Sequence, residues 1–121
     1  MFREVLHETM MRTEGCLGAL VMGTDGIIVE QVWQNSEKKN ASETVVAEFI
    51  SLFKNLRHTT EELNFGKLNE ITLSSDNGSF IFRFVSDDYL IIMLLSQERN
   101  FGRGRYELQR AELLLEKELV L

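Results

Sequence analysis

The clearest pattern in the chain is a continuous apolar run of seven residues. It covers positions 89 to 95 and ends at Ser96. Because seven residues are too few to cross a membrane, the run predicts a strand that is covered on both faces of a sheet. Residues 16 to 22 are also apolar throughout. We therefore expect these two segments to lie side by side in the middle of one sheet.

Alternating polar and apolar positions predict three further strands. Residues 27 to 34 follow a turn signal at 23 to 26, and residues 68 to 75 are joined to residues 80 to 85 by an Asn77-Gly78 hairpin turn. Segments 27 to 34 and 68 to 75 each have a partly polar face, which is typical of edge strands. The expected sheet is therefore five-stranded and antiparallel, in the order 2-1-5-4-3.

Three segments have apolar residues at helical spacing: 2 to 13, about 40 to 64, and 105 to the end. Asn40 and Glu43 have the spacing of a capping box for the middle helix, which makes residues 35 to 40 a polar loop. Both faces of the sheet need cover, so we expect the terminal helices on one face and the middle helix on the other. The fold class is α/β, with the element order α-β-β-α-β-β-β-α.

The apolar arc of the middle helix is wider than one packing surface needs. A single sheet-facing stripe takes about 100° of the circumference. This helix has one row of apolar residues at Val45, Phe49, Leu52, Leu56 and Leu63, and a second row beside it at Val46, Ile50 and Phe53. Two interpretations of the second row remain open: it contacts a second copy of the chain, or it fills the core of one copy.

The strand at 68 to 75 has an edge that a second copy can join, because it contains no proline and one polar face. Pairing across a two-fold axis would bring the two middle helices together on the same face of the sheet. The predicted dimer interface consists of Val46, Ile50, Phe53 and Arg57 on the helix and Glu70, Thr72 and Ser74 on the strand.

Composition narrows the class of protein. The 121 residues are expected to form a single domain, 1-121. The net charge of −6 disfavours binding to nucleic acid or to an anionic membrane surface. Cys16 is the only cysteine, so no intramolecular disulfide is possible, and neither a signal peptide nor a membrane span is recognised. These features predict a cytoplasmic protein.

The side chains that carry chemistry are scattered. His7 and His58 are predicted to lie on opposite faces of the sheet, and Cys16 begins an apolar strand, where a buried thiol is expected. Asp87 and Asp88 are neighbours in a turn and point apart. His, Cys and carboxylate residues do not have metal-ligand spacing. The sequence therefore predicts no catalytic residue, no metal site and no cofactor, and the protein is not expected to be an enzyme.

The main rival to an interaction function is the basic segment from Arg99 to Arg105. Backbone amides at a helix start, together with arginines, can hold a phosphate. The segment lacks the Lys-Ser/Thr ending of a phosphate-binding loop and the glycine spacing of a dinucleotide fold. A small-molecule or nucleotide-binding sensor domain is the alternative function. A sensor needs an unfilled cavity, whereas the many Phe residues and Trp33 favour a filled core.

The Gly18 to Gly26 hairpin, the capped middle helix, and the run Leu90 to Leu95 followed by Arg99-Asn100-Phe101-Gly102 resemble the Roadblock/dynein light-chain domain. The resemblance covers nearly the whole chain and is strongest to small bacterial and archaeal single-domain members. Profilin-like and longin domains share much of this layout.

This resemblance implies a non-enzymatic homodimer that binds a small Ras-like GTPase and scaffolds it or alters its nucleotide cycle. In such families the third strands of two copies pair and the middle helices pack together. A heterodimer with a related chain fits the same pattern.

Overall fold

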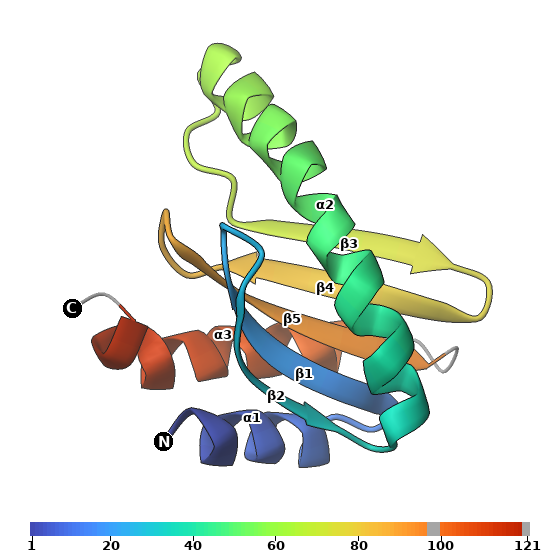
Figure 1. The fold of residues 1–121 in the computed structure, drawn as a ribbon. Helices are drawn as coiled ribbons and strands as arrows, with labels where there is room; N and C mark the ends of the chain where they lie inside the picture. The colour runs from blue at the N-terminus through green and yellow to red at the C-terminus, as the bar shows by residue number, and fades with distance from the viewer. Residues whose placement is uncertain (97–99, 120–121) are drawn as a thin grey trace.

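In the computed structural model, three helices cover a five-stranded antiparallel sheet within the residues that the structure describes (Figure 1). The structure describes residues 1–96 and 100–119, except for the side chains at 41–42 and 117–119. The element order agrees with the prediction, as does the fold class. The elements are α1 (Phe2–Met11), β1 (Cys16–Gly23), β2 (Ile28–Trp33), α2 (Ser36–Glu62), β3 (Glu70–Ser75), β4 (Gly78–Phe84), β5 (Tyr89–Ser96) and α3 (Phe101–Leu119).

The strands lie in the order β2-β1-β5-β4-β3, which confirms the predicted topology. The two continuous apolar runs became the adjacent strands β1 and β5, with Leu20 opposite Ile92 and Val21 opposite Ile91. All four side chains are fully buried. Strands that are buried on both faces need apolar residues at successive positions, which explains why the pattern in these two segments does not alternate.

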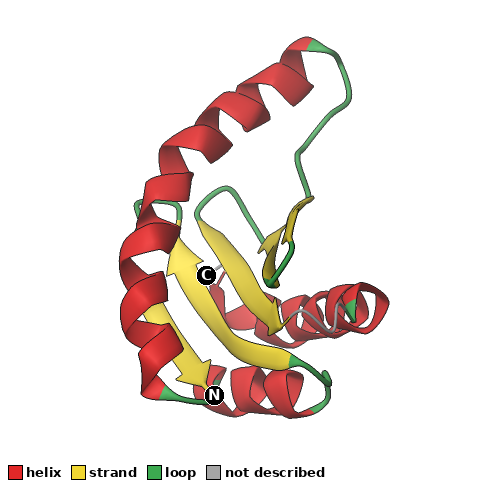
Figure 2. Ribbon diagram, turned by 90° about the vertical axis from the view of Figure 1, so that its right-hand side faces the viewer, coloured by secondary structure: helices red, strands yellow, loops and turns green. Residues whose placement is uncertain are grey.

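The sheet is covered on both faces, as expected. Helices α1 and α3 pack on one face, where Leu6 and Leu108 meet Ala19 and Ile91. Helix α2 crosses the other face (Figures 1 and 2). Beneath it lies a cluster of aromatic rings whose centroids are 4.7 to 6.0 Å apart, formed by Phe49, Phe53, Phe80, Phe82 and Phe84.

Two predicted helix boundaries are wrong. Helix α2 begins at Ser36, and its cap is Asn35, whose side chain accepts a hydrogen bond from the Lys38 amide at 3.2 Å. The polar residues from 36 to 40 therefore form the first exposed turn of the helix and not a loop. Helix α3 begins at Phe101, four residues before the predicted start at Arg105.

Candidate interaction surface

Strand β3 lies at the edge of the sheet and is paired on one side only, with β4. The Phe84 amide donates to the Asn69 carbonyl at 2.9 Å. Hydrogen-bonded positions alternate in an antiparallel ladder, so the odd-numbered residues of β3 bond to β4. The backbone amides and carbonyls of Thr72 and Ser74 therefore point away from the sheet. Both side chains are exposed.

Helix α2 presents a row of apolar side chains to solvent. Val45, Leu52, Leu56 and Leu63 are exposed to 42, 56, 44 and 56%, and their spacing places them on one side of the helix. The C-terminal half of α2 continues past β3, the last strand of the sheet, in both ribbon views (Figures 1 and 2). A chain that joined the sheet at β3 would lie next to this overhanging half of the helix.

The second apolar row of α2 faces the sheet of the same chain. Val46 is fully buried and Phe53 is 4% exposed, while Ile50 is half-buried. The Phe53 ring packs against Phe82 with centroids 4.7 Å apart. Within one copy, Val46 and Phe53 fill the core, which is one of the two interpretations of this row. The chain's own sheet already covers these two side chains, and their contact with a partner stays a prediction.

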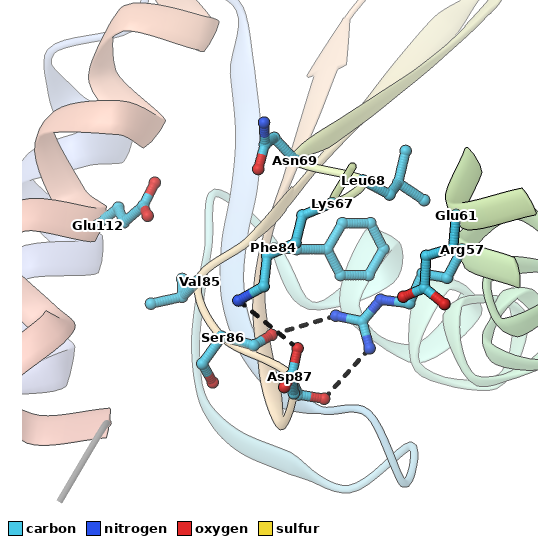
Figure 3. A pocket seen from close by; sticks show the side chains of 10 residues that line it. All are labelled: Arg57, Glu61, Lys67, Leu68, Asn69, Phe84, Val85, Ser86, Asp87 and Glu112. Carbon is cyan, nitrogen blue, oxygen red and sulfur yellow. Dashed lines mark hydrogen bonds and ion pairs between the residues drawn. The ribbon is translucent and has the colours of Figure 1, made fainter. Parts of the chain in front are cut away.

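Arg57 of α2 holds the turn between β4 and β5 (Figure 3). Its Nη1 donates to the Asp87 carbonyl at 3.2 Å and its Nη2 to the Ser86 carbonyl at 3.1 Å. The guanidinium lies 4.5 Å from the centroid of the Phe84 ring, which is cation–π distance. Arg57 was predicted to lie in the dimer interface. In the structure its side chain is already engaged within its own chain.

Glu70 of β3 is also engaged within one chain. Its carboxylate pairs with Arg105 of α3, and with Arg83 of β4 at 3.6 Å. Arg83 in turn donates to Glu112 of α3 at 2.8 Å. This network ties the edge strand to α3. Among the seven predicted interface residues, Thr72 and Ser74 have exposed side chains, and the interface itself stays a prediction.

The exposure of Val45, Leu52 and Leu56 was not predicted from the sequence. The signal was present, because these residues were recognised as one row of the helix. The pattern did not show which of the two rows faces the sheet. That choice depends on which row meets the aromatic side chains Phe80, Phe82 and Phe84 of the sheet.

The groups considered for chemistry do not converge. His7 is exposed on α1, whereas His58 lies on α2 across the sheet and pairs with Glu62 at 3.0 Å. Cys16 is 3% exposed, and burial raises the pKa of its thiol to about 12. Within residues 1–96 and 100–119, no group of three His, Cys, Asp or Glu side chains is arranged to hold a metal ion.

Most of the basic segment suggested as a phosphate site is helical. Arg99 lies outside the described residues. Arg103 pairs with Glu107 at 3.0 Å, and Arg105 pairs with Glu70. A Cβ added at Gly104 would lie 3.1 Å from side-chain atoms of the sheet, so this glycine allows α3 to pack closely on the strands. The charges of Arg103 and Arg105 are therefore used within the chain.

An open depression of about 430 Å³ lies beside the β4–β5 turn (Figure 3). Its lining mixes cations and anions, including Lys67, Glu61 and Asp87. Lys67 Nζ lies 3.8 Å from the Asp87 carboxylate. The space between α2 and the sheet, where a sensor of this layout would hold its ligand, is filled by the aromatic cluster.

The helices described in the structure include none that is both long and apolar enough to cross a membrane.

Comparison with known proteins identifies relatives among solved structures. MglC from Myxococcus xanthus is 30% identical to the chain over 98% of both chains, with a TM-score of 0.69. The Roadblock/LC7 domain from Streptomyces avermitilis has a TM-score of 0.83 at 12% identity and covers 98% of this chain and 97% of its own. A structure of MglB with a tetrameric arrangement has a TM-score of 0.80 at 18% identity, covering 96% of this chain and 85% of MglB.

No family model matches the chain, and no curated protein matches it. The family follows instead from two findings that agree: sequence identity to MglC over almost the full length, and a shared fold with a Roadblock/LC7 domain. The chain belongs to the Roadblock/LC7 domain family.

Proposed function

We propose that this protein is a non-enzymatic homodimeric interaction module that binds a small Ras-like GTPase and scaffolds it or changes its nucleotide cycle. The observation that carries the proposal is the coincidence of two features at one edge of the sheet. The outward-facing backbone of Thr72 and Ser74 lies at the same edge past which the C-terminal half of α2 extends, and this half carries the exposed Leu52 and Leu56.

Self-association would use both features together. An unpaired strand edge is a template for another strand, and a two-fold axis lets β3 pair with β3 of a second copy. The two α2 helices would then lie side by side and bury Leu52 and Leu56. Exposed apolar patches of this kind favour such contacts. The tetrameric arrangement of MglB, which has the same fold, supports self-association.

The GTPase partner is proposed from the family resemblance, and the structure suggests how such a module acts. Two adjacent α2 helices form a broad surface on which a switch protein can dock. Arg57 is bound to two backbone carbonyls and an aromatic ring, so it is not available as an arginine finger. The module would act by holding the switch loops of the GTPase in one arrangement.

The strand contact is tested by Thr72→Pro, with Thr72→Val as the matched control. Proline removes an amide that points away from the sheet, so the β3–β4 ladder keeps its hydrogen bonds. Valine keeps the amide and the β-branched shape. Light scattering should show a monomer for the proline variant and a dimer for the wild type and the valine control. A proline variant with the mass of the wild-type dimer contradicts the β3 contact.

The helix contact is tested by Leu52→Glu with Leu56→Glu. Asn55→Glu is the control, because Asn55 is exposed on the same helix but is not part of the apolar row. The double variant should fold and be monomeric, and the control should keep the wild-type mass. If the double variant remains dimeric, the apolar row is not the interface.

The partner is tested with purified small Ras-like GTPases of the source organism, loaded with GDP or with a non-hydrolysable GTP analogue. Calorimetry should detect binding that differs between the two nucleotide states, and Thr72→Pro should weaken it. Binding by none of these GTPases in either state, measured with the dimeric wild type, refutes the proposed partner.

A further inference from the structure

The sheet has a second edge at β2, and side chains of the same chain occupy it at Gln31. The Gln34 amide donates to the Leu17 carbonyl at 2.9 Å, so by alternation the amide and carbonyl of Gln31 point away from β1. That amide donates to Glu30 Oε1 at 3.0 Å. That carbonyl accepts from Arg3 Nη1 at 3.2 Å. Both outward backbone groups of Gln31 therefore have partners.

Further contacts hold this arrangement in place. Arg3, on α1, also pairs with the Glu30 carboxylate at 3.5 Å. The Gln31 side chain donates to Glu43 of α2 at 2.8 Å and accepts from the Trp33 indole at 2.9 Å. The register of β2 against β1 shifts within the strand, and such an irregularity also disfavours the addition of another strand. The two edges of the sheet thus differ: β2 is capped at Gln31, whereas Thr72 and Ser74 of β3 face outward.

We infer that Arg3 and Glu30 close the β2 edge to strand addition and so restrict self-association to β3. A strand that joined β2 would have to displace Arg3 from the Gln31 carbonyl and Glu30 from its amide. It would also have to desolvate this charged pair, which is costly. An edge strand that carries charged side chains is a common protection against such pairing.

The consequence for assembly rests on the proposed β3 dimer. If both edges accepted strands, β2 of one copy could pair with β3 of the next. That head-to-tail contact joins two different surfaces, so copies add until a ring closes or, where the rotation does not close, build a filament. With β2 closed, only the two-fold β3–β3 contact remains, and it is complete at two copies. Arg3 and Glu30 would therefore limit the assembly to two copies.

The test is the double variant Arg3→Ala with Glu30→Thr, which removes both partners of Gln31 and leaves a residue that favours strands. The control is Glu37→Thr with Lys38→Ala, which removes one acid and one base from exposed positions in the first turn of α2. Sedimentation over a concentration series should give the double variant a weight-average mass at least about twofold above the wild type, since dimers would join through β2. The control should keep the wild-type mass.

A folded double variant with the wild-type mass at every concentration overturns the inference. If the double variant does not fold, the single variant Arg3→Gln replaces it, since this side chain is 68% exposed. Its mass should also rise at the highest concentrations, and an unchanged mass again overturns the inference.

The same measurement in the Thr72→Pro background separates this inference from the proposed function. Opening β2 in a monomeric Thr72→Pro chain should produce new self-association. If no self-association appears in that background, the inference about β2 is wrong and the proposed function is unaffected. If Thr72→Pro does not change the wild-type mass, the β3 dimer is wrong. The rise caused by Arg3→Ala with Glu30→Thr remains measurable in that case.

Discussion

Glu107 shows how a single buried charge joins two helices. Its side chain is fully buried, and its two oxygens accept from Arg12 Nε of α1 at 3.0 and 3.1 Å. Arg103, one turn earlier on α3, pairs with the same carboxylate at 3.0 Å. The hydrogen bond from Arg12 to Glu107, and then the charge of Glu107, raise the pKa of Arg12 above its ordinary value. The contact therefore fixes the end of α1 against α3.

Replacing Glu107 with glutamine should destabilise the fold by about 1–3 kcal/mol, because a neutral amide leaves two guanidinium groups without their counter-charge. Urea unfolding followed by circular dichroism measures the loss. The control is Glu116→Gln, at an exposed position of the same helix, which should change the free energy of unfolding by less than about 0.5 kcal/mol. Equal stabilities of the two variants would contradict this account of Glu107.

Cys16 is predicted to be unreactive in the folded protein. Burial raises the pKa of its thiol from an ordinary value of 9.0 to about 12, so very little thiolate is present at pH 8. Ellman's reagent should therefore label the native chain slowly at pH 8 and the urea-unfolded chain quickly. Fast labelling of the native chain would show that the strand around Cys16 is open.

The raised pKa of Cys16 also determines whether the stability of the fold rises or falls with pH. Between about pH 9 and pH 12 the unfolded chain loses the thiol proton while the folded chain keeps it. Deprotonation therefore favours the unfolded state. The contribution of Cys16 to stability is complete below pH 9 and falls as the pH rises towards 12. A Cys16→Ala variant should lose less stability than the wild type over this range.

At the scale of elements, the strands were easier to predict than the faces of α2. Two continuous apolar runs can only be satisfied by strands buried on both sides, so β1 and β5 followed from the sequence. Both rows of α2 are apolar, and the sequence does not contain the orientation of the helix. The aromatic residues of β4 decide it by packing against Phe53 of the second row, and Phe49, unlike the exposed members of the first row, joins the same cluster.

The start of α2 was missed for a similar reason. Asn35 and Asn40 are both good capping residues, and a glutamate three residues after Asn40 favoured the wrong one. In the structure Asn35 has an extended backbone and caps the helix. Local sequence offered two starts of comparable quality. In the structure the Glu43 carboxylate accepts a hydrogen bond from the Gln31 side chain at 2.8 Å.

Arg57 links α2 to the β4–β5 turn, and Arg57→Lys tests the value of that link. Lysine cannot bond to the Ser86 and Asp87 carbonyls with the same planar fork, and its stacking on Phe84 is weaker. We expect a loss of about 1–2 kcal/mol in the free energy of unfolding. Lys54→Ala, at an exposed position one turn earlier, is the control. If both variants are equally stable, the turn is held by other contacts.

At the scale of the whole molecule, the features that decide assembly join residues far apart in the sequence. Arg3 reaches Gln31 across 28 positions, and Arg105 reaches Glu70 across 35. A pattern of polar and apolar residues predicts which strands are edges, but it does not show which edge the helices protect. For this reason the sequence identified β3 as a candidate interface without revealing that β2 is capped.

A dimer held together by β3 and α2 also predicts how heat stability depends on concentration. Because only the folded chain dimerises, a tenfold increase in protein concentration should add about 1.4 kcal/mol per dimer to the stability of the assembly. For a dimer of two such chains, this gain in stability corresponds to a rise in Tm of about 2–4 °C. Calorimetry of the wild type over a concentration series measures the rise.

Thr72→Pro should melt at a lower temperature that does not depend on concentration, and Thr72→Val should behave like the wild type. A wild-type Tm that stays constant over the series would mean that folding and self-association are not coupled, and the two-copy surface proposed for GTPase binding would lose its physical basis.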